Sequence, residues 1–93
     1  MDPTAEYLLR TARALARRGG KVTVFLTDHA LAASPRAVAD RLRRLSAPHL
    51  NVVADAAILR RRKVDAARLG VAEACEADLS RWLLTPGLNA YWC

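Results

Sequence analysis

The chain has 93 residues, which is enough for one hydrophobic core and too few for two. A hydrophobic fraction of 53% and a charged fraction of 26% are typical of a folded globular domain and exclude a disordered or collagen-like chain. Two cysteines are too few for a disulfide framework or a four-cysteine zinc site. We therefore expect a single domain over residues 1–93, with both thiols free in a reducing, cytoplasmic setting.

The charge balance is strongly basic. Fifteen lysines and arginines against nine aspartates and glutamates give a net charge of +6, which permits an anionic partner, either an acidic protein surface or nucleic acid. No segment has the run of about 20 apolar residues that a membrane span needs. Residues 1–10 also lack the basic start and apolar run of a secretory signal. We expect a cytoplasmic protein without membrane contact.

The apolar pattern alternates between helical and extended spacing along the chain. Two helices begin at a capping residue followed by proline, at Asp2-Pro3 and Ser34-Pro35, and the clearest strand is a β-branched and aromatic run that we expect to be buried on both faces. In chain order, the expected elements are a helix at 3–17, a strand at 21–27, a helical turn at 30–33, a helix at 35–45, a strand at 50–55, a helix at 56–62, a helical turn at 65–69, a helix at 71–84 and a strand at 89–93. This order indicates a small α/β domain with a mostly parallel sheet and helices on both faces.

Four sequence blocks together carry a family resemblance. They are the start Asp2-Pro3-Thr4, the strand at 20–28, the segment 52–57 with the basic run 60–64 after it, and the segment 82–87 followed by Tyr91-Trp92-Cys93. In this order they resemble the DsrE-like (DsrE/DsrF/DsrH-like) sulfur-relay family over nearly the whole chain. The resemblance implies a flavodoxin-like, five-stranded sheet, assembly into trimers or hexamers and, in some members, transfer of a persulfide sulfur by one cysteine.

The chain departs from this family in three places. It starts where the family's first, central strand has ended, so either the sheet closes differently, with the strands at 21–27 and 50–55 pairing directly, or another subunit covers the edge, or the natural chain begins upstream of Met1. The family's sulfur-carrying cysteine corresponds to Ala54 or Asp55, and an aspartate cannot carry a persulfide. Lys63 replaces a glycine of the family. The resemblance therefore implies a truncated or degenerate member.

Cys93 is the candidate catalytic residue because it ends the last predicted strand, at the sheet edge where α/β proteins bind ligands. Solvent and a sulfur donor would reach a thiol at this edge. The basic run at 60–63 would activate the thiol, whereas the α-carboxylate of a terminal residue would oppose the thiolate. Of the two interpretations we favour an inert terminal Cys93 over a reactive one. Cys75 is expected to be a buried apolar residue on the inner face of the helix at 71–84.

Three other polar residues follow predicted strands: Asp28 and His29 after the first, and Asp55 after the second. Parallel strands bring their carboxyl ends to one rim, where two carboxylates and an imidazole would suit general acid–base chemistry or a divalent metal. Aspartate and histidine are also common capping and turn residues after strands. We favour the capping interpretation and expect no metal and no cofactor. With Arg60 and Arg61, these residues are the candidate ligand-binding set.

Two arginine clusters are the strongest charge feature. One is the run at 60–63, and the other contains Arg41, Arg43 and Arg44. Such clusters bind nucleic-acid phosphates, but both lack the base-stacking aromatic residues of single-strand recognition. The favoured interpretation is a solvated helical face, or ion pairs with acidic residues of a neighbouring subunit, namely Glu73, Glu76 and Asp78.

These patterns support three functions, in order of preference. The first is a non-catalytic or degenerate oligomeric accessory protein of intracellular sulfur relay. The second is a persulfide carrier that uses Cys93, which would make any enzymatic activity sulfurtransferase-like. The third is an anion- or nucleic-acid-binding module that uses the arginine clusters. The expected partners are further copies of the chain, as a dimer, trimer or hexamer, and a sulfur-relay protein.

Overall fold

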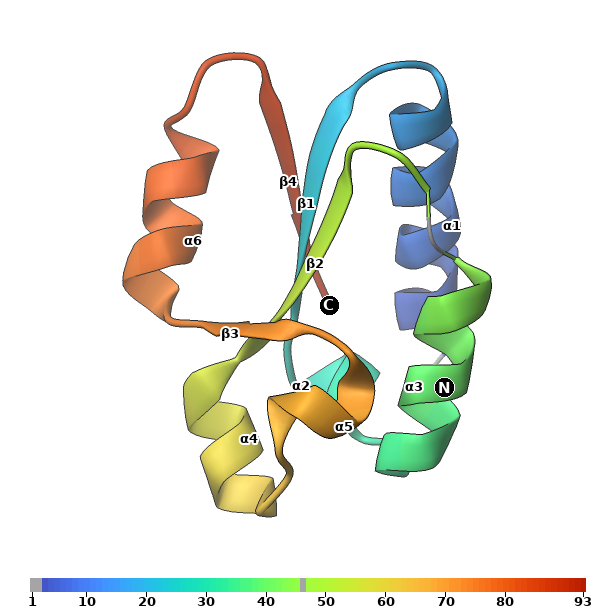
Figure 1. Ribbon diagram of the computed structural model, residues 1–93. Helices are drawn as coiled ribbons and strands as arrows, with labels where there is room; N and C mark the ends of the chain where they lie inside the picture. The colour runs from blue at the N-terminus through green and yellow to red at the C-terminus, as the bar shows by residue number, and fades with distance from the viewer. Residues whose placement is uncertain (1–2, 46) are drawn as a thin grey trace.

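The computed structural model describes residues 3–45 and 47–93. At its centre is a four-stranded sheet in which all neighbouring strands run parallel, in the order β3-β2-β1-β4 (Figure 1). The strands are β1 (Lys21–Leu26), β2 (Leu50–Asp55), β3 (Ala72–Ala74) and β4 (Leu88–Trp92). The α/β class is therefore confirmed, and the sheet contains one strand more than the sequence pattern predicts.

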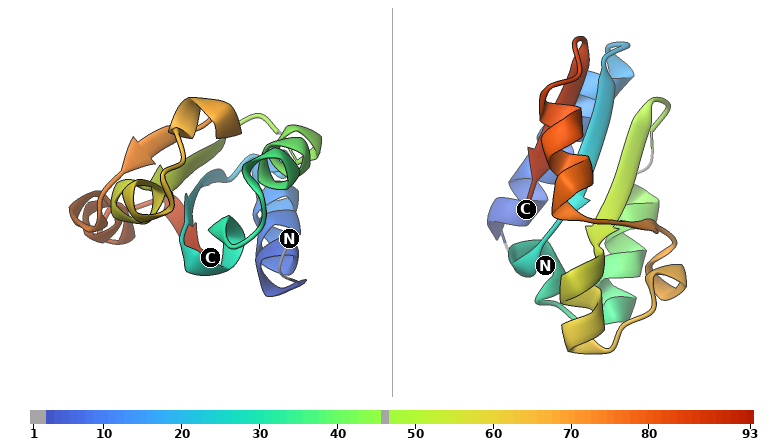
Figure 2. Two further views of the ribbon diagram at one scale, coloured as in Figure 1. Left: turned by 90° about the horizontal axis from the view of Figure 1, so that it is seen from below. Right: turned by 90° about the vertical axis from the view of Figure 1, so that its left-hand side faces the viewer.

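Helices precede and connect the strands. Within the described residues they are α1 (Pro3–Arg17), α2 (Asp28–Leu31), α3 (Pro35–Arg44), α4 (Ala56–Arg62), α5 (Ala66–Leu69) and α6 (Glu76–Leu83). Figure 2 shows α1 and α3 on one side of the sheet and α6 on the other, so that the strands form a middle layer. No helix among the described residues is both long and apolar enough to cross a lipid bilayer.

The main core lies between the sheet and the helices α1 and α3. Alternate residues of β1 point into it, and its largest fully buried side chains are all at most 1% exposed: Leu9, Val22, Val24, Leu26, Val38 and Leu59. In β1, every residue after Lys21 is buried, which confirms the prediction of a strand enclosed on both faces.

The face toward α6 has a much smaller core. Phe25, Val53 and Ala74 are buried there, and Leu79 and Trp82 of α6 pack against them. The rings of Phe25 and Trp82 meet edge to face, with centroids 6.4 Å apart and planes inclined at 65°. Because α6 has no buried residue of its own, it covers this face only in part.

β1 lies at the centre of the sheet. It pairs with β2 on one side, where Val24 lies opposite Val52, and with β4 on the other, where Val24 lies opposite Tyr91. The two strands expected to flank a missing first strand therefore pair directly. No gap has to be filled between β1 and β2.

The prediction of one continuous helix over residues 71–84 is wrong. The first part of this stretch is the edge strand β3, which pairs with the end of β2, and α6 begins only at Glu76. Apolar residues repeat at helical spacing through the stretch, which explains the error. Gly70, with φ of 72°, ends α5 before this stretch, whereas the acidic residues Glu76 and Asp78 are typical of a first helical turn and are the local sign that α6 begins there.

The remaining elements lie within two residues of their predicted bounds. β2 and α4 match, whereas α2 starts at Asp28 instead of Ala30. The Ser34 hydroxyl accepts a hydrogen bond from the Ala37 N–H at 3.3 Å, as expected for a capping residue ahead of Pro35. The helix cap predicted at Asp2 lies outside the described residues.

Candidate functional site

Open α/β sheets commonly bind ligands beyond the carboxyl ends of the two strands between which the strand order reverses, and in this sheet those strands are β1 and β4. In this protein α2 fills that position and buries Ala30 and Leu31. The Ala30 N–H donates to the Cys93 carbonyl oxygen at 2.7 Å, and the Cys93 N–H donates to the Phe25 carbonyl oxygen at 3.0 Å. The backbone of Cys93 therefore ties α2 to β1.

Cys93 is buried, with only 3% of its surface exposed, and belongs to the main core cluster. The expectation that solvent and a sulfur donor reach this thiol is wrong. The sequence places Cys93 correctly at the carboxyl edge, but it does not reveal that α2 folds back over that edge. Because a persulfide carrier must present its sulfur to a partner, this burial opposes that use of Cys93.

The rim of the sheet brings together Asp28 and the end of α4. The Oδ1 atom of Asp28 lies 3.6 Å from Nη2 of Arg61 and 3.7 Å from Nη2 of Arg62. The three side chains are between 41% and 70% exposed, so each contact contributes at most about 1 kcal/mol. His29 lies beside Asp28 in α2 and is also exposed. The candidate rim residues Asp28 and Arg61 are thus neighbours, as the parallel sheet predicts.

Asp55 has a structural role at the same edge. Its buried carboxylate accepts hydrogen bonds from the N–H groups of Ala57 at 2.9 Å and Ile58 at 3.4 Å, which caps α4. The capping interpretation of this residue is therefore the one that the geometry supports. In the described part of the chain, no three histidine, cysteine, aspartate or glutamate side chains gather closely enough to hold a metal ion.

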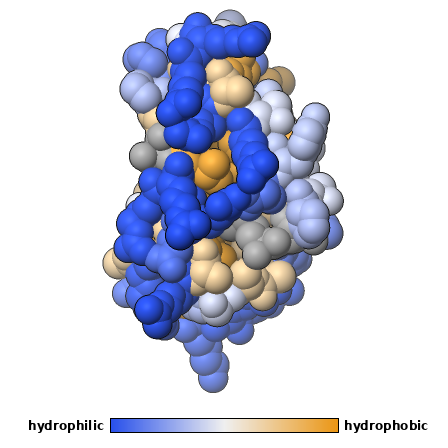
Figure 3. All heavy atoms as spheres, turned by 90° about the vertical axis from the view of Figure 1, so that its right-hand side faces the viewer, coloured by the Kyte–Doolittle hydropathy of each residue, from blue (hydrophilic) through white to orange (hydrophobic). Residues whose placement is uncertain are grey.

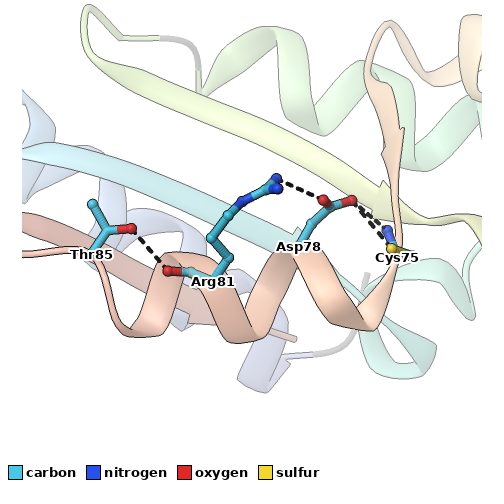
Figure 4. Close-up of polar contacts among 4 residues, drawn as sticks. All are labelled: Cys75, Asp78, Arg81 and Thr85. Carbon is cyan, nitrogen blue, oxygen red and sulfur yellow. Dashed lines mark hydrogen bonds and ion pairs between the residues drawn. The ribbon is translucent and has the colours of Figure 1, made fainter.

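Cys75 lies at the start of α6 and is exposed, which corrects the prediction that it is buried on a helix face. Figure 4 shows its contacts with Asp78. The Asp78 Oδ2 atom accepts from the Cys75 N–H at 3.0 Å and from the Cys75 thiol at 3.4 Å, and Arg81 Nη2 lies 2.7 Å from Asp78 Oδ1. These hydrogen bonds from Cys75, followed by the charge of Arg81, lower the pKa of Asp78.

Three of the four α3 arginines are exposed, and two of these, Arg36 and Arg43, line a hollow together with Arg68 of α5. Arg41 is tied to α1, because its Nε donates to Glu6 Oε2 at 2.7 Å. The hollow of about 420 Å³ between α3 and α5 is lined by Arg36, Arg43 and Arg68, with Asp40 as its one acidic residue. On the side of the molecule formed by α1 and α3, hydrophilic side chains surround a strip of apolar surface (Figure 3).

Arg36 and Arg68 are not among the residues that the sequence pattern predicts for a site. Arg36 and Arg43 are seven residues apart, which places them on the same face of α3, so part of this basic hollow was readable from helical spacing. Arg68 belongs to the separate helix α5 and joins the group only through the tertiary packing of α3 against α5. The basic run at 60–63 is a different surface, at the end of α4.

A second hollow of about 420 Å³ lies beside the first and is mainly apolar. Its lining includes Leu9 of α1, Leu42 of α3, Leu50 of β2 and Leu69 of α5. Arg43 lines both hollows. A volume of this size is within the range of about 300–1,000 Å³ that is usual for small-molecule sites.

The fold and these surfaces define the class of the protein as a three-layer α/β domain with an all-parallel sheet. No protein-family model, curated protein or solved structure matches the chain.

Proposed function

We propose that this protein is a non-catalytic accessory protein of intracellular sulfur relay that works as a homo-oligomer. The observation that carries the proposal is an apolar surface at the end of α6 and on β4, which we call the α6–β4 patch. It consists of Leu83, Leu84 and Trp92, which are 52%, 84% and 54% exposed. Leu83 and Leu84 lie at the end of α6 and Trp92 lies at the far end of β4, and large apolar side chains left exposed on these two adjacent elements favour an interaction surface.

The edge of the sheet next to this patch favours a second copy of the chain as the partner. β4 is an edge strand, and its sequence from Leu88 to Trp92 contains neither proline nor a charged residue. Edge strands are usually protected from pairing by such residues. A two-fold axis beside β4 would pair it with β4 of a second copy and bury Trp92 of both chains in one self-complementary interface.

Two observations on the thiols and carboxylates support a non-catalytic role. The position that corresponds to the family's sulfur-carrying cysteine is Asp55 or its neighbour Ala54, and the carboxylate of Asp55 is engaged in capping α4. The thiol of Cys93, the other candidate, is enclosed by the core. Neither group is presented to a sulfur donor.

The assignment to sulfur relay rests on the sequence blocks that resemble the DsrE-like family, and one backbone feature supports it. Lys63 stands where the family has a glycine, and its φ of 55° and ψ of 43° are in the left-handed region that favours glycine. The chain thus keeps the turn for which a glycine would be the preferred residue. The expected further partner is another protein of the sulfur relay.

Sedimentation equilibrium at micromolar concentrations tests the oligomer. We expect a mass of at least two chains, and we expect Leu84→Lys to shift the protein to monomer because it places a charge in the α6–β4 patch. Tyr7→Lys is the matched control, since Tyr7 is a large, 71% exposed side chain on α1, away from the patch. A monomeric wild type, or equal dissociation in both variants, would contradict the proposal.

Mass spectrometry after incubation with a persulfide donor tests whether a cysteine of this protein accepts a sulfur atom. We expect no added sulfur atom on Cys93. Added sulfur that disappears in Cys93→Ser but persists in Cys75→Ser would establish the persulfide-carrier function instead.

A further inference from the structure

The two hollows beside the α3–α5 contact form a surface that self-association through the α6–β4 patch does not use. The basic hollow is lined by arginines of α3 and α5, and the apolar hollow by leucines of α1, α3, β2 and α5. Arg43 lines both hollows, so a molecule that contacts this side chain has an apolar compartment on one side and a cationic one on the other.

The charge of the basic hollow is unbalanced. Three guanidinium groups and one carboxylate line it, and three minus one leaves two positive charges. Arg43 is paired with Asp40 in the same helix, whereas Arg36 and Arg68 form no ion pair with a carboxylate of the described residues. A phosphate monoester, which has a charge of about −1.5 to −2 at pH 7, would balance this excess. Planar guanidinium groups also match phosphate oxygens in geometry.

The apolar hollow indicates what kind of group should be attached to this phosphate. Its lining is dominated by aliphatic side chains, and Arg43 and Asn51 are its polar members. A purely inorganic anion would leave this volume unused, and a neutral hydrocarbon would leave Arg36 and Arg68 of the adjoining basic hollow without a counter-ion. An unbranched alkyl chain attached to a phosphate satisfies both hollows together.

We propose that the protein binds a single-chain alkyl phosphate, with the chain in the apolar hollow and the phosphate on Arg36, Arg43 and Arg68. The affinity then has two separable parts. Each methylene group buried in the apolar hollow contributes up to about 0.8 kcal/mol, and the phosphate contributes through charge-assisted hydrogen bonds to the arginines.

Isothermal titration calorimetry with methyl, hexyl and decyl phosphate tests the proposal, each used below the concentration at which it forms micelles. We expect decyl phosphate to bind at least tenfold more tightly than methyl phosphate. Decanol, which has the same chain without the charge, should bind at least tenfold more weakly than decyl phosphate. Equal affinity for methyl and decyl phosphate would overturn the proposal and would favour a simple anion site or a polyanion such as nucleic acid.

Variants separate the two hollows. Arg43→Ala should weaken decyl phosphate binding about tenfold, and Arg36→Ala and Arg68→Ala should each weaken it several-fold. Arg44→Ala is the matched control, because Arg44 is an exposed arginine of the same helix that lines neither hollow. Equal losses in Arg43→Ala and Arg44→Ala would overturn the proposed phosphate position, because they would reflect only the general positive charge.

Ala72→Phe tests the apolar hollow without changing any charged residue of the basic hollow. Ala72 is exposed and lines the apolar hollow, so a larger side chain there should fill part of the volume. We expect this variant to reduce the preference for decyl over methyl phosphate at least fivefold while methyl phosphate binding is unchanged. An unchanged chain-length preference, in a variant whose circular dichroism and thermal unfolding match the wild type, would overturn the proposed chain position.

Discussion

The two faces of the sheet differ in how completely the chain itself covers them. On one face, α1 and α3 bury a core that extends from α1 through β1 to α4 and α5. On the other face, the eight-residue helix α6 covers a three-residue cluster and has no buried residue of its own. The monomer therefore gains most of its stability from the α1–α3 face, whereas the α6 face leaves apolar surface that a partner could cover.

The largest predicted effect concerns the α1–α3 face. Leu9→Ala should lower the free energy of unfolding by about 2–5 kcal/mol, because it leaves a cavity under a fully buried side chain. Leu84→Ala, at the exposed end of α6, should change it by less than about 0.5 kcal/mol. Urea unfolding followed by circular dichroism measures both values at protein concentrations where the chain is monomeric. Similar decreases in the free energy of unfolding for the two variants would contradict the conclusion that the α1–α3 face supplies most of the stability.

The next prediction concerns the one aromatic contact on the α6 face. Trp82→Ala should lower the free energy of unfolding by about 2 kcal/mol, less than a fully buried tryptophan costs, because Trp82 is only partly buried. Trp82→Phe should recover part of this loss, since an edge-to-face ring pair with Phe25 contributes about 0.5–1.5 kcal/mol beyond its buried area. A loss above that of Leu9→Ala would show that α6 is more strongly attached than its burial indicates.

A smaller effect is expected at Asp55, where β2 ends and α4 begins. Asp55→Ala should lower the free energy of unfolding by about 1 kcal/mol, because two N–H groups at the start of α4 lose their acceptor. Asp55→Asn keeps an acceptor oxygen and should cost less. Thermal unfolding of the two variants measures the difference. Equal costs would mean that the negative charge, not the hydrogen bonds, is what α4 requires at this position.

The smallest predicted effect is a pH dependence on the α6 face. The pKa of Asp78 in the folded protein is held below its ordinary value of 3.8, chiefly because the carboxylate accepts the Cys75 N–H. The unfolded state therefore binds the proton more readily, so the stabilisation is fully present above pH 3.8 and is lost as the pH falls through the folded-state pKa. Carbon-13 NMR titration of the Asp78 carboxyl group measures this pKa. In Cys75→Pro, which removes the N–H, the pKa should return toward 3.8; an unchanged value would assign the shift to Arg81.

How much of this fold the sequence predicts depends on how local each element is. β1 is a continuous β-branched run, and α4 has a capping aspartate and an apolar edge, so both are recognisable without knowing their neighbours. β3 has only three residues and exists because the end of β2 pairs with it. Its exposed residues Ala72 and Glu73 have no apolar pattern of their own.

In the candidate site, too, the features that depend on nearby residues were predictable and those that depend on distant segments were not. The capping role of Asp55 and its place after a strand are local properties, and they were predictable. The enclosure of Cys93 depends on α2, a segment more than sixty residues earlier in the chain, and the meeting of Arg43 with Arg68 depends on how α5 packs against α3. No spacing in the sequence reports such contacts, and these are the features on which both proposals depend.

The two edges of the sheet are unequal, and this limits how far an assembly built on the sheet can grow. β3, at one edge, is three residues long and carries Glu73, whereas β4, at the other, offers five uncharged residues. A sheet with two open edges adds copies without end and becomes a filament. With one open edge, strand pairing closes after two copies, so an assembly of three or six subunits would have to be built through helices.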